Sequence, residues 1–153
     1  LALHNVYLEG AVLKPNMVKN GLTGPKAPAE TVAALTVQTL RRTVPAAMPG
    51  IFFLSGETAL DEDNEETATI NLNAMHAQKA MSLPWSVSFS FGKALQKTCI
   101  VTWMGKDENV KAAQQALLNR AKANSEAVFG KYVAGSCKSI GSDGNVAMQG
   151  GAY

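Results

Sequence analysis

The chain has 153 residues, of which 46% are hydrophobic and 17% are charged. This composition suits one folded segment of about domain size. The formal net charge of +2 is too small to favour nucleic acid or an anionic membrane surface as a partner. No run of about 18 apolar residues is present that could span a membrane. No signal peptide precedes the first predicted strand, and because the chain lacks an initiator Met we expect further sequence upstream.

The first strand is predicted over Val6 to Leu13, an apolar run that ends before Pro15. Proline disfavours helical geometry in the residue before it, so Lys14 should be extended. A loop rich in Gly and Pro follows, and a helix is expected from Ala29 to Arg42. Its residues at helical spacing are Val32, Leu35, Thr36, Thr39 and Leu40.

Further strand–helix units follow in the same order. Strands are predicted over Ile51–Leu54 and Trp85–Phe91, and helices over Glu65–His76 and Lys93–Trp103. The longest helix is expected over Asn109–Phe129. Its apolar positions include Val110, Ala113, Leu117, Leu118 and Ala121.

The third predicted strand alternates clearly between two faces. One face carries the large apolar residues Trp85, Val87, Phe89 and Phe91, and the other carries Ser86, Ser88 and Ser90. A strand that presents small polar groups on one face suits the lining of a barrel near a site. We interpret Trp85 as core packing, the usual role of a buried aromatic residue.

An acidic cluster crowds the start of the second helix. It consists of Asp61, Glu62, Asp63, Glu65 and Glu66. Carboxylates favour the positive end of a helix, so we predict a solvated cluster there. A calcium loop is not expected, because the EF-hand spacing and its Gly are missing. Cys99 and Cys137 are predicted to be reduced thiols, and no metal-ligand spacing involves the isolated His4 and His76.

Alternating strands and helices predict an α/β fold with a parallel sheet. Three strands would leave both edges of the sheet open, so we expect the remaining strands upstream. A (β/α)8 barrel needs about 250 residues, and the chain would supply its C-terminal part over residues 1–129. Residues 130–153 are rich in Gly and Ser and should form a mobile tail. A doubly wound sheet is the alternative, although no Gly-rich dinucleotide fingerprint follows any strand.

Three predicted strand ends carry residues that could act on a phosphorylated carbonyl compound. Lys14 ends the first strand, where apolar neighbours would remove water from its amine and favour the neutral nucleophile. Ser55-Gly56 and Gly92-Lys93 follow the next two strands and precede helices. Backbone N–H groups at such turns can bind an anion, and Gly permits close approach. Each turn alone is weak support, but together they suggest an amine beside a phosphate site.

The segment LEGAVLKPNM, residues 8–17, resembles the Schiff-base segment of class I fructose-bisphosphate aldolases. Other segments occur in the order and spacing of that family, and the resemblance covers nearly the whole chain. These are FLSG at 53–56, NLNAM at 71–75, WSVSFSFG at 85–92, AKANS at 121–125 and the terminal Ala152-Tyr153.

The resemblance implies cleavage of fructose 1,6-bisphosphate to dihydroxyacetone phosphate and glyceraldehyde 3-phosphate, without a metal or other cofactor. It makes Lys14 the imine-forming lysine and Tyr153 a proton-transfer group. It assigns phosphate binding to Ser55, Gly56, Gly92 and Lys93, and pocket lining to Leu54 and Ser90. The family's acid/base carboxylates lie on upstream strands, so we expect the 153 residues alone to be inactive and poorly folded.

Three departures from the family pattern concern the phosphate site. Lys93 stands where the family has arginine. Lysine keeps the positive charge but lacks the bidentate fork of the arginine guanidinium. Glu57 stands where the family usually has a second Gly, and the loop from Glu57 to Asn64 is longer than usual. These changes bear on phosphate affinity, and the preference between bisphosphate and monophosphate sugars stays open.

Two other functions compete with this reading. One is another imine-forming barrel, of the transaldolase or deoxyribose-phosphate type, which the match at Tyr153 disfavours. The other is a binding or scaffold role toward cytoskeletal filaments or adhesin tails. The resemblance also implies a homotetramer in the cytoplasm, with a plastid as the alternative compartment.

Overall fold

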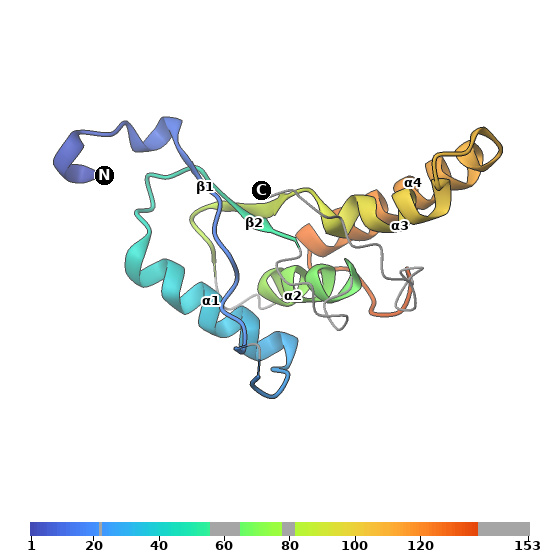
Figure 1. Cartoon of the computed structure of the whole chain (residues 1–153). Coiled ribbons are helices and arrows are strands. Elements are labelled where there is room, and N and C mark those ends of the chain that lie inside the picture. The colour runs from blue at the N-terminus through green and yellow to red at the C-terminus, as the bar shows by residue number, and fades with distance from the viewer. Residues whose placement is uncertain (22, 56–64, 78–81, 138–153) are drawn as a thin grey trace.

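The computed structural model describes residues 1–21, 23–55, 65–77 and 82–137, in which strands alternate with helices (Figure 1). The strands form one parallel sheet in the order β1-β2-β3. Their bounds are β1 Val12–Leu13, β2 Gly50–Leu54 and β3 Ser86–Ser90. The α-helices are α1 Ala29–Thr43, α2 Glu65–Ala77, α3 Lys93–Trp103 and α4 Val110–Val128. Short 3-10 helices are η1 Ala2–His4, η2 Leu8–Gly10 and η3 Asp107–Asn109.

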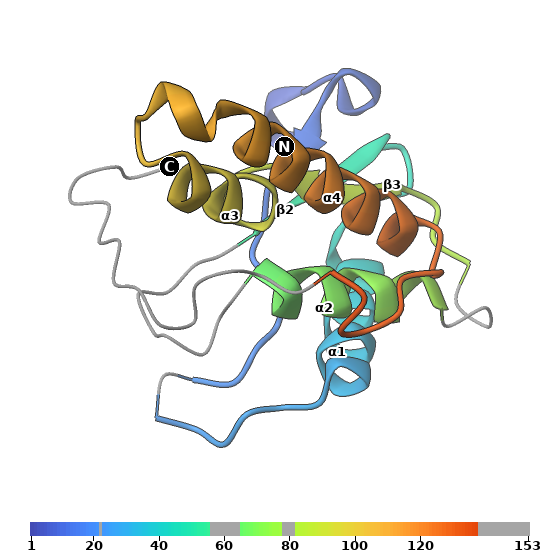
Figure 2. The ribbon, with the colours of Figure 1, turned by 90° about the vertical axis from the view of Figure 1, so that its right-hand side faces the viewer.

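The helices pack in neighbouring pairs around the sheet. Helix α1 contacts α2, α3 contacts α4, and α2 also contacts α3 and α4. Figure 2 shows α3 and α4 running alongside each other, with α2 between this pair and α1. The hydrophobic core lies between these helices and the sheet, where Ile51 and Phe53 of the central strand β2 are completely buried. No helix in the described part of the chain combines the length and apolar character needed to cross a membrane.

The first strand is much shorter than predicted. Residues 8–10 form η2, and only Val12 and Leu13 pair with β2. Gly10 allows this turn because it has no side chain. The Tyr7 ring occupies that space, and its Cδ1 lies 2.7 Å from where a Cβ of residue 10 would be. The predicted strand was apolar, yet Val6, Tyr7 and Val12 are exposed. Their hydrophobic pattern is typical of buried residues, but these three side chains are not buried within the described part of the chain.

Two helices differ from the prediction in which residues they bury. In α1, the predicted Val32, Thr36 and Leu40 are buried, but Leu35 and Thr39 are exposed. Ala33 and Val37 are buried in their place. In α4, Leu118 is 64% exposed, and Val110, Leu117 and Ala121 are exposed as well. The buried residues of α4 are Ala113, Arg120, Ala123, Asn124 and Ala127. The largest apolar side chains therefore misidentified the buried face of α4.

The alternation of the third strand is confirmed where the strand is paired. Trp85, Val87 and Phe89 are buried, and the Trp85 indole N–H donates to the Pro45 carbonyl at 3.0 Å. Trp85 thus has the packing role that the sequence predicted. Phe91 departs from the prediction, because it lies beyond the end of β3 and is 47% exposed. Its ring meets Phe89 edge-on, with centroids 6.0 Å apart.

The packed part of the chain continues beyond α4 to Cys137. Tyr132 is buried, its N–H donates to Asn73 Oδ1 at 2.8 Å, and its hydroxyl donates to Glu66 Oε1 at 2.9 Å. Burial is the main reason that the pKa of Tyr132 is raised, and the Glu66 carboxylate adds to the shift. The predicted mobile tail thus begins with eight residues, 130–137, that the structure describes against α2. Residues 138–153 lie outside the described residues.

Candidate active site at the carboxyl ends of the strands

Parallel pairing brings the carboxyl ends of the three strands to one edge of the sheet. Leu54 and Ser90 are partners in the β2–β3 register, and both are half-buried. The Leu54 N–H donates to the Pro15 carbonyl at 3.1 Å, which continues the β1–β2 pairing past Lys14. The predicted pocket-lining residues Leu54 and Ser90 are therefore adjacent, and the Lys14-Pro15 segment lies beside them.

Ser55 and Gly92, predicted to bind phosphate, are in direct contact. The Ser55 side chain is buried, with 4% of the residue exposed. Its Oγ accepts the N–H of Gly92 at 3.3 Å and the N–H of Ala94 at 3.2 Å. We call these three residues the Ser55 turn. A hydroxyl has two lone pairs and one proton, so its proton is what this hydroxyl can offer a ligand.

The Ser55 turn lies at the amino end of α3. Gly92 is the N-cap residue, and its carbonyl accepts the amides of Leu95 and Gln96 as the helix begins. Lys93 is the first residue of the helix and is half-buried. The partial positive charge of a helix amino end favours an anion at this place.

Lys14 lies at the expected strand end, but its side chain is exposed. The prediction that apolar strand residues would shield this amine is wrong for the described residues. The physical reason is that, within the described part of the chain, β1 pairs only with β2 and has no strand on its other side. With the described residues, Lys14 makes no hydrogen bond or ion pair.

Two predicted site residues cannot be placed. Gly56 and Tyr153 lie outside the described residues, as does Glu57, the departure from the family pattern. The structure therefore brings together Ser55, Gly92 and the start of α3, and it sets Leu54 and Ser90 beside them.

The sequence reasoning missed a buried polar network directly behind the Ser55 turn. Glu65, predicted to be part of a solvated cluster, is completely buried. One carboxylate oxygen accepts the Thr98 N–H at 2.7 Å, and the other accepts the Thr98 hydroxyl. The adjacent Glu66 is half-buried and accepts the Tyr132 hydroxyl and the Gly135 amide. Asp61, Glu62 and Asp63 of the same cluster lie outside the described residues.

Arg120 is the centre of this network and is only 1% exposed. Its Nε donates to the Ala94 carbonyl at 2.9 Å. Its Nη2 donates to the Glu65 carbonyl at 3.1 Å and to Thr69 Oγ1 at 2.6 Å. The Glu65 carboxylate lies 4.0 Å from Nε and balances the charge. One guanidinium on α4 therefore fixes α2 and α3.

One signal in the sequence could have revealed this network. Ala113, Arg120 and Ala127 recur every seven residues, and Ala123 and Asn124 lie between them on the same face. Small residues on both sides of a charged one allow close helix packing around it. The pattern did not lead to a prediction of burial, because Arg and Glu are almost never fully buried unless they are paired.

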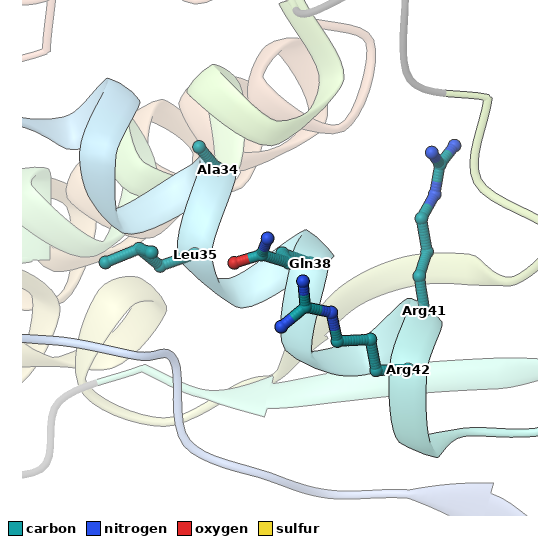
Figure 3. Close-up of a pocket in the computed structure, with 5 residues that line it drawn as sticks. All are labelled: Ala34, Leu35, Gln38, Arg41 and Arg42. Carbon is teal, nitrogen blue, oxygen red and sulfur yellow. The ribbon is translucent and has the colours of Figure 1, made fainter.

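A surface hollow of about 460 Å³ lies elsewhere, on α1. Figure 3 shows that its lining residues all belong to this helix. They are Ala34, Leu35, Gln38, Arg41 and Arg42. None of them is a predicted site residue, and the buried face of α1 lies on other residues. This hollow is thus an outward surface of one helix and takes no part in the candidate site.

Comparison with known proteins agrees with the resemblance of the sequence. The family model described as "Glycolytic: Fructose-bisphosphate aldolase class-I" matches residues 1–153. This chain belongs to the class I fructose-bisphosphate aldolase family. A cytoplasmic isozyme of Cicer arietinum is 55% identical over 132 residues, which cover 86% of this chain and 35% of that protein. The Drosophila melanogaster aldolase is 52% identical over 136 residues, covering 89% of this chain and 36% of that protein.

A solved aldolase structure shows the same arrangement of the backbone. The Plasmodium falciparum fructose-bisphosphate aldolase, in a complex with TRAP and a small-molecule inhibitor, has a TM-score of 0.77 and 50% identity. The match covers 86% of this chain and 36% of that one. The chain thus spans about a third of the length of its aldolase relatives. The predicted fold class, α/β as part of a (β/α)8 barrel, is confirmed.

Proposed function

We propose that this chain supplies the imine-forming lysine and a phosphate site of an enzyme that cleaves fructose 1,6-bisphosphate. The observation that carries the proposal is the Ser55 turn. A buried hydroxyl, the amides of Gly92 and Ala94 and the amino end of α3 meet at the edge of the sheet where Lys14 follows β1. A phosphate group and a ketone in one substrate match an anion site next to an amine. Membership of the aldolase family supports this reaction class.

In the proposed mechanism, the Lys14 amine attacks the ketone carbon, and water leaves as the imine forms. The protonated imine accepts the electron pair of the C3–C4 bond when that bond breaks, and glyceraldehyde 3-phosphate leaves. A proton then returns to the enamine carbon, with help from Tyr153, and hydrolysis releases dihydroxyacetone phosphate. Ser55, Gly56, Gly92 and Lys93 hold a substrate phosphate, and Leu54 and Ser90 line the pocket.

The proposed enzyme needs more than this chain. Carboxylates that move protons would come from upstream strands of the same barrel, and these strands would also cover the open edge of β1. As part of the proposal, the enzyme is a cytoplasmic homotetramer. The cytoplasmic location follows the names of relatives such as the Cicer arietinum and Pisum sativum isozymes.

The test uses a completed barrel, which is the chain within its full-length protein or joined to the upstream part of the Cicer arietinum aldolase. Dihydroxyacetone phosphate and borohydride are added, and the adduct is located by mass mapping. We expect the adduct on Lys14 and its loss in Lys14→Met. Lys19→Met is the matched control, five residues away, and should keep the adduct. A folded completed barrel that forms no adduct on Lys14 would disprove the imine mechanism.

A binding role is the second candidate, because the Plasmodium falciparum aldolase was solved in a complex with TRAP. If filament or adhesin binding is a function of this chain, a pull-down with the completed barrel should be sensitive to salt and survive Lys14→Ala. Failure of both filaments and adhesin tails to bind a folded protein would exclude this role.

A further inference from the structure

We propose that Arg120 is a positioning residue that holds the Ser55 turn in its phosphate-binding geometry. The inference rests on the proposed phosphate role of that turn. Two side chains of α4 converge on the carbonyl of Ala94, the third residue of the turn. Arg120 Nε donates to this carbonyl at 2.9 Å, and Asn124 Nδ2 donates to it at 3.0 Å. Two buried donors on one carbonyl fix the orientation of the peptide that follows Ala94.

Residue Ala94 connects the network to the site. Its carbonyl is held by α4, while its N–H donates to Ser55 Oγ beside that of Gly92. A rotation of α3 about its amino end would therefore disturb both amides and the serine hydroxyl together. Anion binding at such a turn depends on the alignment of its donors. Arg120, at 1% exposure, acts on a phosphate only through this turn.

The shape of the guanidinium makes arginine hard to replace here. Its Nε faces Ala94 on α3, while Nη2 faces the Glu65 carbonyl and Thr69 Oγ1 on α2. Lysine would keep the charge opposite the Glu65 carboxylate, but a single ammonium cannot reproduce this planar fork. The Arg120→Lys variant therefore separates the geometry of the contact from its charge.

The second support of α3 is the contact between Thr98 and Glu65. Thr98 lies one helical turn after Ala94, and both its N–H and its hydroxyl donate to the Glu65 carboxylate. This carboxylate is the counter-ion of Arg120, at 4.0 Å. Thr98→Val removes only the hydroxyl contact at nearly constant volume, whereas Thr98→Ser retains it.

The experiment measures phosphate recognition and imine formation separately in the completed barrel. For Arg120→Lys we expect the KM for fructose 1,6-bisphosphate to rise about tenfold, the scale of one weakened charge-assisted hydrogen bond. The inhibition constant of inorganic phosphate should rise by a similar factor, with kcat nearly unchanged. Borohydride trapping of Lys14 with dihydroxyacetone, which has no phosphate, should keep its parent rate. Arg42→Lys makes the same change on the exposed face of α1 and should leave all values unchanged.

Each outcome decides the proposal. Folded Arg120→Lys with the parent's phosphate inhibition constant would overturn it. Equal losses in dihydroxyacetone trapping and phosphate affinity would also overturn it, because they indicate general damage to the fold. If Arg120→Lys does not fold, a raised phosphate inhibition constant in Thr98→Val, with parent values in Thr98→Ser, supports the proposal. Equal constants in these two variants refute it. Failure of the proposed function is recognised separately, because the unmodified barrel would then form no adduct on Lys14.

Discussion

The two halves of the candidate site differ in what holds them. We call Val12 to Lys14 the β1 edge. We call the buried contacts that Arg120 and Asn124 of α4 make with α2 and α3 the helical corner. At the β1 edge, two strand residues pair with β2 on one side only, and Lys14 is exposed. At the helical corner, the polar side chains are buried and form hydrogen bonds with one another or with the helix backbones. They are Arg120, Glu65, Thr69 and Asn124. In the described residues, no buried polar side-chain atom lacks a hydrogen-bond partner.

This difference shows which half of the site the chain builds by itself. The Ser55 turn is fixed by contacts between segments of this chain that are far apart in sequence. Lys14 has only its local backbone geometry, and the nearby Val12 of the β1 edge is exposed. The proposed phosphate half therefore has its own scaffold within the described residues, whereas the proposed chemistry at Lys14 would require cover from other residues.

The largest expected effect separates chemistry from stability at the β1 edge. Lys14→Met in the completed barrel should lower kcat on the order of 10⁶-fold, the scale seen when a catalytic nucleophile is removed. The thermal midpoint should not fall, because Lys14 makes no hydrogen bond or ion pair with the described residues. Steady-state kinetics and calorimetry measure the two values. If Lys14→Met lowers the thermal midpoint as much as the helical-corner variant Glu65→Gln does, the two regions do not differ in their contribution to stability.

The next effect belongs to the helical corner. Glu65→Gln removes the counter-ion of the buried Arg120, and breaking a buried ion pair costs about 3 to 5 kcal/mol of unfolding free energy. Urea unfolding of the completed barrel measures this loss. Glu108→Gln, an exposed carboxylate in η3, is the control and should leave the transition unchanged. If the two variants unfold alike, the buried pair does not stabilise the corner.

A smaller effect tests whether residues 130–137 belong to the corner. Gly130 has φ +65°, and a Cβ there would lie 2.8 Å from the Ala77 nitrogen and 2.9 Å from the His76 carbonyl carbon. Gly130→Ala combines a left-handed backbone with this overlap, so we expect a loss of about 3 kcal/mol. Gly135 has φ +82° but no atom within 4 Å of its Cβ position. Gly135→Ala should therefore cost only about 1 kcal/mol, and equal losses in urea unfolding would show that Gly130 is not in close contact with α2.

Much of the fold could be predicted from the sequence, because hydrophobic periodicity reports burial within this chain. The bounds of β2, β3 and α1 to α4 lie within about two residues of the prediction, which is the usual uncertainty of element ends. The prediction of β1 was too long because residues 8–10 form η2 and only Val12 and Leu13 pair with β2. The exposure of Leu118 shows a similar limit, since an apolar residue on a helix does not identify what covers it.

The candidate site was predictable only in part. Parallel strand ends share one edge, so the contact of Ser55 with Gly92 followed from the order of the elements. The helical corner did not, because its hydrogen bonds join residues such as Thr69 and Asn124, which are 55 positions apart. Glu65 appeared among neighbouring acidic residues that usually remain solvated. The packing of α2 against both α3 and α4 buries this one carboxylate.

The lone pairs of Ser55 have a consequence for the charge of the ligand. Both lone pairs accept backbone amides, so the described part of the turn presents only hydrogen-bond donors to an anion. These donors are the serine proton and the amino end of α3. A phosphate ester that carries its own proton would find no acceptor for it among these groups. The site should therefore select the dianion over the monoanion. Because the second phosphate pKa is about 6, the affinity of the turn for its ligand should weaken as the pH falls below that value, even if every protein group keeps its charge.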